Sequence, residues 1–170
     1  MTIKVGHGTS DIKIKDISLA LNVAFSKSYI DFLLRLNGVA IFGDSYCTIP
    51  FEKVDDGEVD FQALYGLDGE NKNFDLQSNN DIRNETTSLS SPFVIGGDSG
   101  GNYYLMNANG VDEAVYYWDR SHIHFDNNFD YPESNEEGNI YKLADSFDSF
   151  FQIVVENVIG GNDFVISDLW

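Results

Sequence analysis

The chain has 170 residues, of which 42% are hydrophobic and 14% aromatic, and this size and composition predict one domain over residues 1–170 with a single buried core. Its 28 acidic and 10 basic residues give a formal net charge of −18, which repels nucleic-acid phosphates and anionic lipid, so direct binding to nucleic acid or membrane is not expected. No apolar run reaches about 18 residues and no basic start precedes an apolar segment, and Cys47 is the only cysteine, so we expect a cytoplasmic protein without an internal disulfide.

The N-terminal part of the chain predicts two helices. Residues 1–10 are polar and are expected to fray or to form a short sheet edge. Residues 11–22 have the apolar spacing of a short amphipathic helix, although Ile14 also fits a strand placed first. Ser26 is a suitable N-cap for a second helix, whose apolar residues recur at i, i+3, i+4 and i+7 and which ends at residues 37–38.

Short strands and loops are predicted next. Residues 39–42 and 46–51 fit a hairpin joined by a turn at 43–45. Residues 52–60 form an acidic loop, and residues 61–67 alternate well enough for another strand.

The middle of the chain contains a weak helix pattern and a strong hairpin pattern. Residues 68–73 predict a polar turn and residues 73–84 a helix, for which the asparagine content is unfavourable. Residues 93–106 predict two strands joined by a glycine-rich turn around Asp98 and Ser99, whose backbone visits positive φ or passes too close to a neighbour for a β-carbon. The glycines of this structural turn are Gly96, Gly97, Gly100 and Gly101.

The C-terminal part predicts two further strands and a closing helix. The strands are expected at residues 114–118 and 141–144, on either side of an acidic loop at 126–138. Asp145 or Ser146 is a suitable N-cap for the helix. Its buried face is predicted to be Phe147, Phe150, Phe151 and Val154.

An apolar tail follows the last predicted helix. Its apolar residues are expected to pack back on the domain or to contact a partner. They are Phe164, Val165, Ile166, Leu169 and Trp170. The order of helices and strands, with hairpin-length connections, predicts a mainly antiparallel twisted sheet with helices packed on it, in the α+β class.

Residues 97–101 have the same letters as the segment around the nucleophile of chymotrypsin-like serine proteases. That mechanism needs a histidine base and a buried aspartate, in the chain order His, Asp, Ser. Only His7 precedes Ser99, and it lies in a glycine-flanked start. The motif is therefore not interpreted as a protease site.

Metal sites are also weakly indicated. His122 and His124 would share one face of a strand, and Asp119 or Asp126 could complete a zinc or nickel site, but no fourth ligand is evident and a solvent-facing histidine pair is favoured. The acidic loops lack the spacing of a calcium-binding EF-hand loop. We predict no metal and no cofactor.

Five blocks of the chain, in order, resemble a known family. They are residues 29–38, 64–67, 93–103, 115–119 and 143–151. These blocks look like those of the SMI1/KNR4 superfamily, also called SUKH, and the likeness covers roughly residues 11–157, with an extra tail at 158–170. The chain departs from the family at Val39, where a glycine is common, and in a longer loop before Tyr141.

The resemblance implies an α+β domain without known catalysis. In bacteria such domains serve chiefly as immunity proteins that bind and neutralise a polymorphic toxin, often a nuclease. A nuclease is basic where it holds phosphates, so an acidic inhibitor suits it. We therefore expect an immunity protein that occludes a basic toxin surface. A non-catalytic intracellular regulatory or scaffold protein is the alternative, and a hydrolase using Ser99 or the histidine pair is a weaker one.

The candidate contacts with the toxin lie at the glycine-rich turn and on the neighbouring strands. They are Tyr65, Asp98, Asn102, Trp118 and Asp119. The alternative is that Trp118 belongs to the core and that the glycine turn only holds the sheet. The sequence predicts no oligomeric state.

Overall fold

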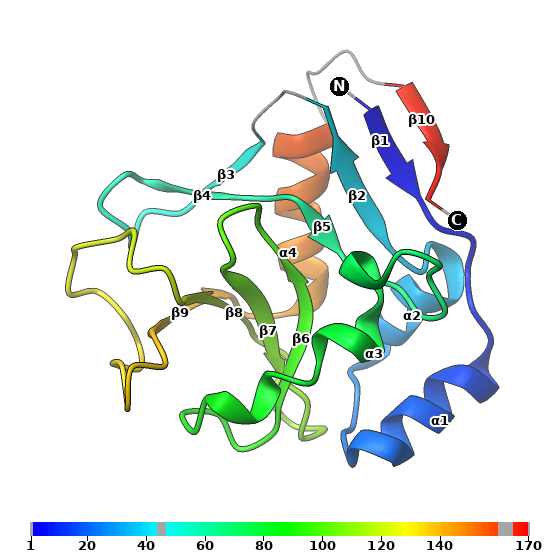
Figure 1. The fold of residues 1–170 in the computed structure, drawn as a ribbon, viewed down its shortest axis with the longest axis horizontal. Helices are drawn as coiled ribbons and strands as arrows, with labels where there is room; N and C mark the ends of the chain where they lie inside the picture. Colours follow the sequence, from blue (N-terminus) through cyan, green and yellow to red (C-terminus); the bar gives the residue numbers. More distant parts are fainter. Residues whose placement is uncertain (1, 44–46, 160–164, 170) are drawn as a thin grey trace.

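The computed structural model describes residues 2–43, 47–159 and 165–169, and within them eight strands form one sheet (Figure 1). In chain order the strands are β1 (Thr2–Val5), β2 (Val39–Phe42), β5 (Ala63–Leu64), β6 (Pro92–Gly97), β7 (Tyr103–Asn107), β8 (Val115–Asp119), β9 (Asn139–Ala144) and β10 (Val165–Asp168). In space they follow the order β10-β1-β2-β5-β6-β7-β8-β9. The pairing of β1 with β10 is parallel and the others are antiparallel.

Helices cover the sheet. They are α1 (Asp11–Leu21), α2 (Lys27–Arg35), α3 (Leu76–Asn79) and α4 (Phe147–Val154), with 3₁₀ turns η1 (Lys72–Phe74) and η2 (Arg83–Glu85) and a π-helical turn η3 (Val155–Ile159). In Figure 1, α4 lies behind the sheet and α3 in front of it. The prediction of an α+β fold with a mainly antiparallel sheet is confirmed.

The three longer helices begin where the sequence predicts. Ser26 Oγ accepts a hydrogen bond from the Tyr29 N–H, and Ser146 Oγ accepts one from the Ser149 N–H, so each serine satisfies an N–H group that the first helical turn leaves unpaired. The segment for which a strand was the alternative is the helix α1, which Ser10 caps. Ile14 lies within this helix and is buried, as is Ile17.

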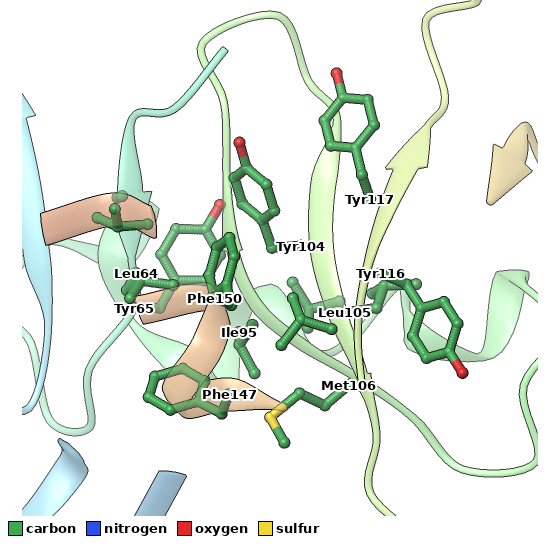
Figure 2. Close-up of a cluster of buried hydrophobic side chains, with 14 of the residues drawn as sticks. Leu64, Tyr65, Ile95, Tyr104, Leu105, Met106, Tyr116, Tyr117, Phe147 and Phe150 are labelled. Carbon is green, nitrogen blue, oxygen red and sulfur yellow. The ribbon is translucent and has the colours of Figure 1, made fainter. Parts of the chain in front are cut away.

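The core between α2, α4 and the sheet is aromatic. The Phe147 ring lies 5.0 Å from that of Tyr29 and 5.2 Å from that of Phe32, measured between ring centroids. Figure 2 shows that the core has two ends: the hydroxyls of Tyr104 and Tyr117 point to one end, and Phe147 lies at the other. The polar end of this cluster adjoins the candidate site described below.

Two predictions about the strands are wrong. The described residues of the predicted 46–51 strand do not pair with β2, because β2 already lies between β1 and β5, and residue 46 lies outside the described residues. Instead β3 (Thr48–Pro50) pairs with β4 (Glu58–Asp60) in a separate two-stranded sheet, and β4 takes the end of the predicted acidic loop. Residues 44 and 45 of the predicted turn lie outside the described residues, and the predicted strand at 61–67 is reduced to β5.

The helix predicted over residues 73–84 is also wrong, since the segment divides into η1, α3 and η2. Polar side chains compete there for the backbone. Asn80 Nδ2 donates to the carbonyls of Leu76 and Val94, and Asn80 Oδ1 accepts from the Val94 N–H. The asparagine thus pairs with the edge of β6 instead of continuing a helix.

The two ends of the chain meet in the sheet. The first residues form neither a frayed end nor an edge, because β1 lies between β2 and β10. Of the two roles predicted for the tail, packing on the domain is the one observed, with Leu169 against the core. Phe164 and Trp170 lie outside the described residues. Within the described part of the chain, no helix has the length and apolar character needed to span a membrane.

Candidate functional site

The turn between β6 and β7 is built around the carboxylate of Asp98. Asp98 Oδ1 accepts hydrogen bonds from the N–H groups of Gly100 (2.8 Å) and Asn102 (2.9 Å). Asp98 Oδ2 accepts bonds from the Asn102 side-chain amide (2.9 Å) and the Tyr117 hydroxyl (3.0 Å). These donors compensate the buried charge and give the turn a fixed shape.

Asn102 connects this turn to the segment that follows β8. Its side chain is fully buried, and its Oδ1 accepts hydrogen bonds from the N–H groups of Arg120 and Ser121 (both 2.9 Å) and from the Ser121 hydroxyl (2.8 Å). Its amide group donates to Asp98. Both ends of the Asn102 side chain are therefore used to hold two segments together.

Asp119, at the end of β8, holds the next part of the same segment. Its fully buried carboxylate accepts hydrogen bonds from the N–H groups of Ile123 (3.2 Å) and His124 (3.1 Å). His122 has a φ of +54°, in the left-handed region that is unfavourable for most side chains. The two bonds to Asp119 stabilise this tight turn.

Trp118 and Tyr65 are also buried. The Trp118 indole N–H donates to the carbonyl of Glu137, and the Arg120 guanidinium lies 4.7 Å from the centre of the indole ring. Burial raises the pKa of the Tyr65 hydroxyl above its ordinary value, so this side chain is neutral. Both residues support the sheet beneath the surface.

Backbone geometry accounts for glycine at two positions of the turn. A β-carbon at Gly96 would lie 2.3 Å from the carbonyl oxygen of Ala63, and Gly101 has a φ of +91°. Gly97 and Gly100 belong to the same turn, at the end of β6 and just after Asp98.

The five residues proposed as toxin contacts are thus all buried in the protein by itself. Three of them, Asp98, Asn102 and Asp119, form one hydrogen-bonded group with the segment after β8. Their part in partner binding stays a prediction, and burial means that they would act through the exposed residues that they position.

Those exposed residues lie on two segments that touch. We call them the 120–125 loop, which follows β8, and the 51–57 turn, which joins β3 to β4. Asp55 Oδ1 lies 2.9 Å from His124 Nδ1, and Asp55 Oδ2 accepts a hydrogen bond from the Phe125 N–H (3.2 Å). These two bonds hold the pKa of Asp55 below its ordinary value. In Figure 1 the tip of the cyan β3–β4 hairpin meets the yellow chain after β8.

His124 is the buried member of this contact. His124 Nδ1 faces the Asp55 carboxylate and donates a hydrogen bond to it. Nε2 is buried and has no hydrogen-bond partner among the described residues. A hollow of about 340 Å³ lies beside it, lined by His124, Ile123 and Val59 and by the acidic residues Asp56, Glu58 and Asp60.

A metal ion would find ligands here, but the contacts are explained without one. One ligand atom each of Asp55, Asp56 and His124 lies within 4.8 Å of the others. The Asp55 carboxylate is already bonded to His124 Nδ1 and to a backbone N–H. The sequence had associated His122 with His124, whereas His122 lies beside Glu133, 3.5 Å away.

Ser99 has no catalytic partner in the described residues. It is exposed at the turn. Each of the three histidines lies beside a carboxylate: His7 beside Asp168, His122 beside Glu133 and His124 beside Asp55. The protease-like sequence at residues 97–101 is explained by the glycine turn around Asp98. It does not place a histidine base beside the Ser99 hydroxyl.

Negative charge is concentrated around the two segments. Residues 52–60 and 119–138 contain eleven of the 28 acidic residues and two of the 10 basic residues. These 29 positions therefore carry a formal charge of −9, half of the −18 of the whole chain. The two basic residues of the region are already in ion pairs, Lys53 with Asp130 and Arg120 with Glu85.

The sequence interpretation missed Asp55, Ile123 and Phe125 as site residues. Their signal was present, because Ile123 and Phe125 are apolar residues between two acidic stretches. What the sequence does not give is the contact across some 70 positions that brings the 51–57 turn to the 120–125 loop.

A comparison with protein-family models matches residues 8–153 to a family described as "SMI1 / KNR4 family (SUKH-1)". The match covers most of the chain, including the glycine turn, the 51–57 turn and the 120–125 loop. A comparison with curated proteins finds no match.

Proposed function

The chain belongs to the SMI1/KNR4 family (SUKH-1), and from this premise we propose that it is an immunity protein that binds and neutralises a cognate protein toxin. The toxin is a basic protein of the nuclease type, and neutralisation is by occlusion. The protein itself carries out no reaction, and it acts inside the cell.

The observation that supports this proposal is the uneven distribution of charge. Half of the net negative charge lies on 29 positions, and those positions form neighbouring loops at one end of the sheet. A nuclease needs a basic surface to hold phosphate, so an acidic surface of this kind can occupy it. Opposite charges also accelerate the encounter of the two proteins.

The geometry also favours binding over catalysis. The carboxylates of Asp98 and Asp119 are occupied by N–H and O–H donors, and Ser99 has no histidine within hydrogen-bond distance among the described residues. These groups hold the backbone in place. They are not arranged to transfer a proton to a substrate.

The test is a titration calorimetry experiment. The probe is the C-terminal domain of the protein encoded immediately upstream, with its catalytic residue substituted, measured at low and at high salt. We expect tight binding that weakens steeply as salt rises, because exposed charges are screened. We also expect co-expression of the chain to protect cells from the active domain.

No heat at either salt concentration and no protection would contradict the proposal. That result would favour a regulatory or scaffold protein of the same family. Binding that is insensitive to salt would retain the immunity role and remove the charge-steering mechanism.

A further inference from the structure

We infer that the toxin docks on the 120–125 loop, with Phe125 entering an apolar recess of the toxin and an arginine of the toxin entering the acidic hollow beside it. This inference rests on the proposed function and specifies its surface. The partner is therefore a basic protein face that carries an arginine next to an apolar depression.

The first observation is the exposure of apolar side chains in a highly charged region. Phe125 is 85% exposed and Ile123 is 43% exposed. An exposed phenylalanine gives up the stabilisation that burial would provide. Single exposed apolar residues are common, however, so exposure by itself identifies no site.

The second observation is that the backbone carrying Phe125 is held from three sides. The N–H groups of Arg120 and Ser121 donate to Asn102, those of Ile123 and His124 donate to Asp119, and that of Phe125 donates to Asp55. These acceptors come from the β6–β7 turn, the end of β8 and the 51–57 turn.

This bracing fixes the backbone from which an aromatic side chain with little packing of its own projects. A loop fixed before binding loses less conformational entropy when the complex forms. Central aromatic anchors in such positions contribute a large part of the binding free energy at protein interfaces. The loop thus has the features of a preformed anchor.

Val111 provides an internal comparison. It is 88% exposed, in the turn between β7 and β8, and its N–H donates to the side chain of Asn109, two residues earlier. That is an ordinary local turn. Val111 therefore matches Phe125 in exposure and lacks the three distant acceptors.

The third observation is the chemistry of the hollow. Asp56, Glu58 and Asp60 supply negative charge, and His124 lines the same hollow with a buried Nε2 that has no hydrogen-bond partner among the described residues. Asp55, which holds the other nitrogen of His124, is not part of the lining. A cation with N–H donors suits this hollow, because ionised carboxylates only accept hydrogen bonds.

Arginine meets this requirement best. Its planar guanidinium offers five N–H donors and remains charged, so it can bond several carboxylates at once. Burial, together with the charges of Asp98 and Glu58, raises the pKa of Asp60. A guanidinium beside these carboxylates would offset the repulsion between them.

The experiment compares matched variants in the same calorimetric titration and in stopped-flow association. Phe125→Ala is compared with Val111→Ala, because both remove exposed apolar side chains. Asp56→Asn combined with Glu58→Gln is compared with Asp11→Asn combined with Asp16→Asn, because both pairs remove two exposed negative charges. A denaturant midpoint for every variant confirms that it folds.

We expect Phe125→Ala to weaken binding by about 30-fold or more, as at an aromatic hot spot. The Asp56 and Glu58 double variant should slow association at low salt by roughly 10-fold, with a smaller effect at high salt. Each control should remain within about 2-fold of the wild type, which is the ordinary result for residues outside a hot spot.

The outcomes separate the two proposals. If the wild type binds and Phe125→Ala binds equally well, the docking surface is wrong and the immunity function stands. If only the acidic double variant behaves like its control, the arginine in the hollow is wrong and the anchor stands. If the wild type itself does not bind, the proposed function fails.

Discussion

Two interior regions of the protein are built on different principles. Between α2, α4 and the sheet, aromatic rings such as Tyr29, Phe32 and Phe147 pack at 5.0–6.1 Å between ring centres. Beneath the 120–125 loop the interior consists of carboxylate and amide groups, with Asp98 and Asn102 at its centre. Both regions exclude water, since their side chains are almost completely buried.

The difference lies in what each kind of interaction determines. Apolar packing is non-directional, so it provides stability but tolerates small shifts of the chain. Hydrogen bonds to buried charged groups are directional and costly to leave unmade, so they determine where each N–H group lies. The aromatic region therefore holds the fold together, and the polar region sets the shape of one surface loop.

The largest effect on stability is expected in the aromatic region. Phe147→Ala removes a ring that contacts Tyr29 and Phe32 and leaves a cavity between α4 and α2. We expect the free energy of unfolding to fall by about 3–5 kcal/mol. Chemical denaturation measures this, with Phe125→Ala as an exposed control that should change little. A loss below about 1 kcal/mol would show that the helices do not depend on this packing.

A smaller loss is expected in the polar region, with a different signature. Asn102→Ala leaves the N–H groups of Arg120 and Ser121 without their acceptor and removes one of the two donors to Asp98 Oδ2. At about 1–3 kcal/mol for each unsatisfied buried group, partly relieved by water, we expect a loss of roughly 2–4 kcal/mol.

Hydrogen exchange separates this effect from general destabilisation. In Asn102→Ala, the amides of residues 120–125 should exchange faster than expected from global unfolding. Asn107→Ala is the matched control, because Asn107 is a buried asparagine that holds Ser90 and Ser91 at the other end of β7. Equal exchange of the loop amides in both variants would refute a positioning role for Asn102.

The smallest change in stability is expected on removing a single hydroxyl group from each region, that of Tyr117 or that of Tyr29. The Tyr117 hydroxyl donates to Asp98, whereas the Tyr29 hydroxyl is buried without a hydrogen-bond partner among the described residues. We expect Tyr117→Phe to cost about 1–2 kcal/mol and Tyr29→Phe to cost nothing or to stabilise slightly. Thermal unfolding of both variants gives the answer, and equal costs would mean that the Tyr29 hydroxyl has a partner.

Much of the fold could be predicted because its signals are local. Ser26 and Ser146 mark the starts of α2 and α4, and the apolar spacing that follows each of them defines a buried face. The glycines around Asp98 mark the turn between β6 and β7. In each case the information lies within one turn of helix or one hairpin.

The errors arose where distant segments decide the structure. The strand at residues 46–51 was paired with its neighbour in sequence, but β1 and β5 occupy both sides of β2. The helix at residues 73–84 is broken because Asn80 pairs with Val94 of β6. Neither partner is visible in the local pattern.

The candidate site shows the same limit. The sequence identified Asp98, Asn102 and Asp119 by residue type and turn context, but it could not show that their side chains face inward. Burial depends on the packing of β7 and β8, and the exposure of Phe125 depends on contacts from the 51–57 turn. The polar residues that were chosen are the supports of a surface that other residues present.

The pairing of β1 with β10 also determines an order of assembly. Thr2 and Val165 are register partners, so this contact closes a loop of nearly the whole chain, and both strands lie outside the stretch matched by the family model. The entropy cost of closing such a loop is met late, after β2 has provided a template for β1. We therefore expect these two strands to be the last part of the sheet to form and the first to separate, while the family-matched remainder, with the 120–125 loop near the opposite edge of the sheet, keeps its shape.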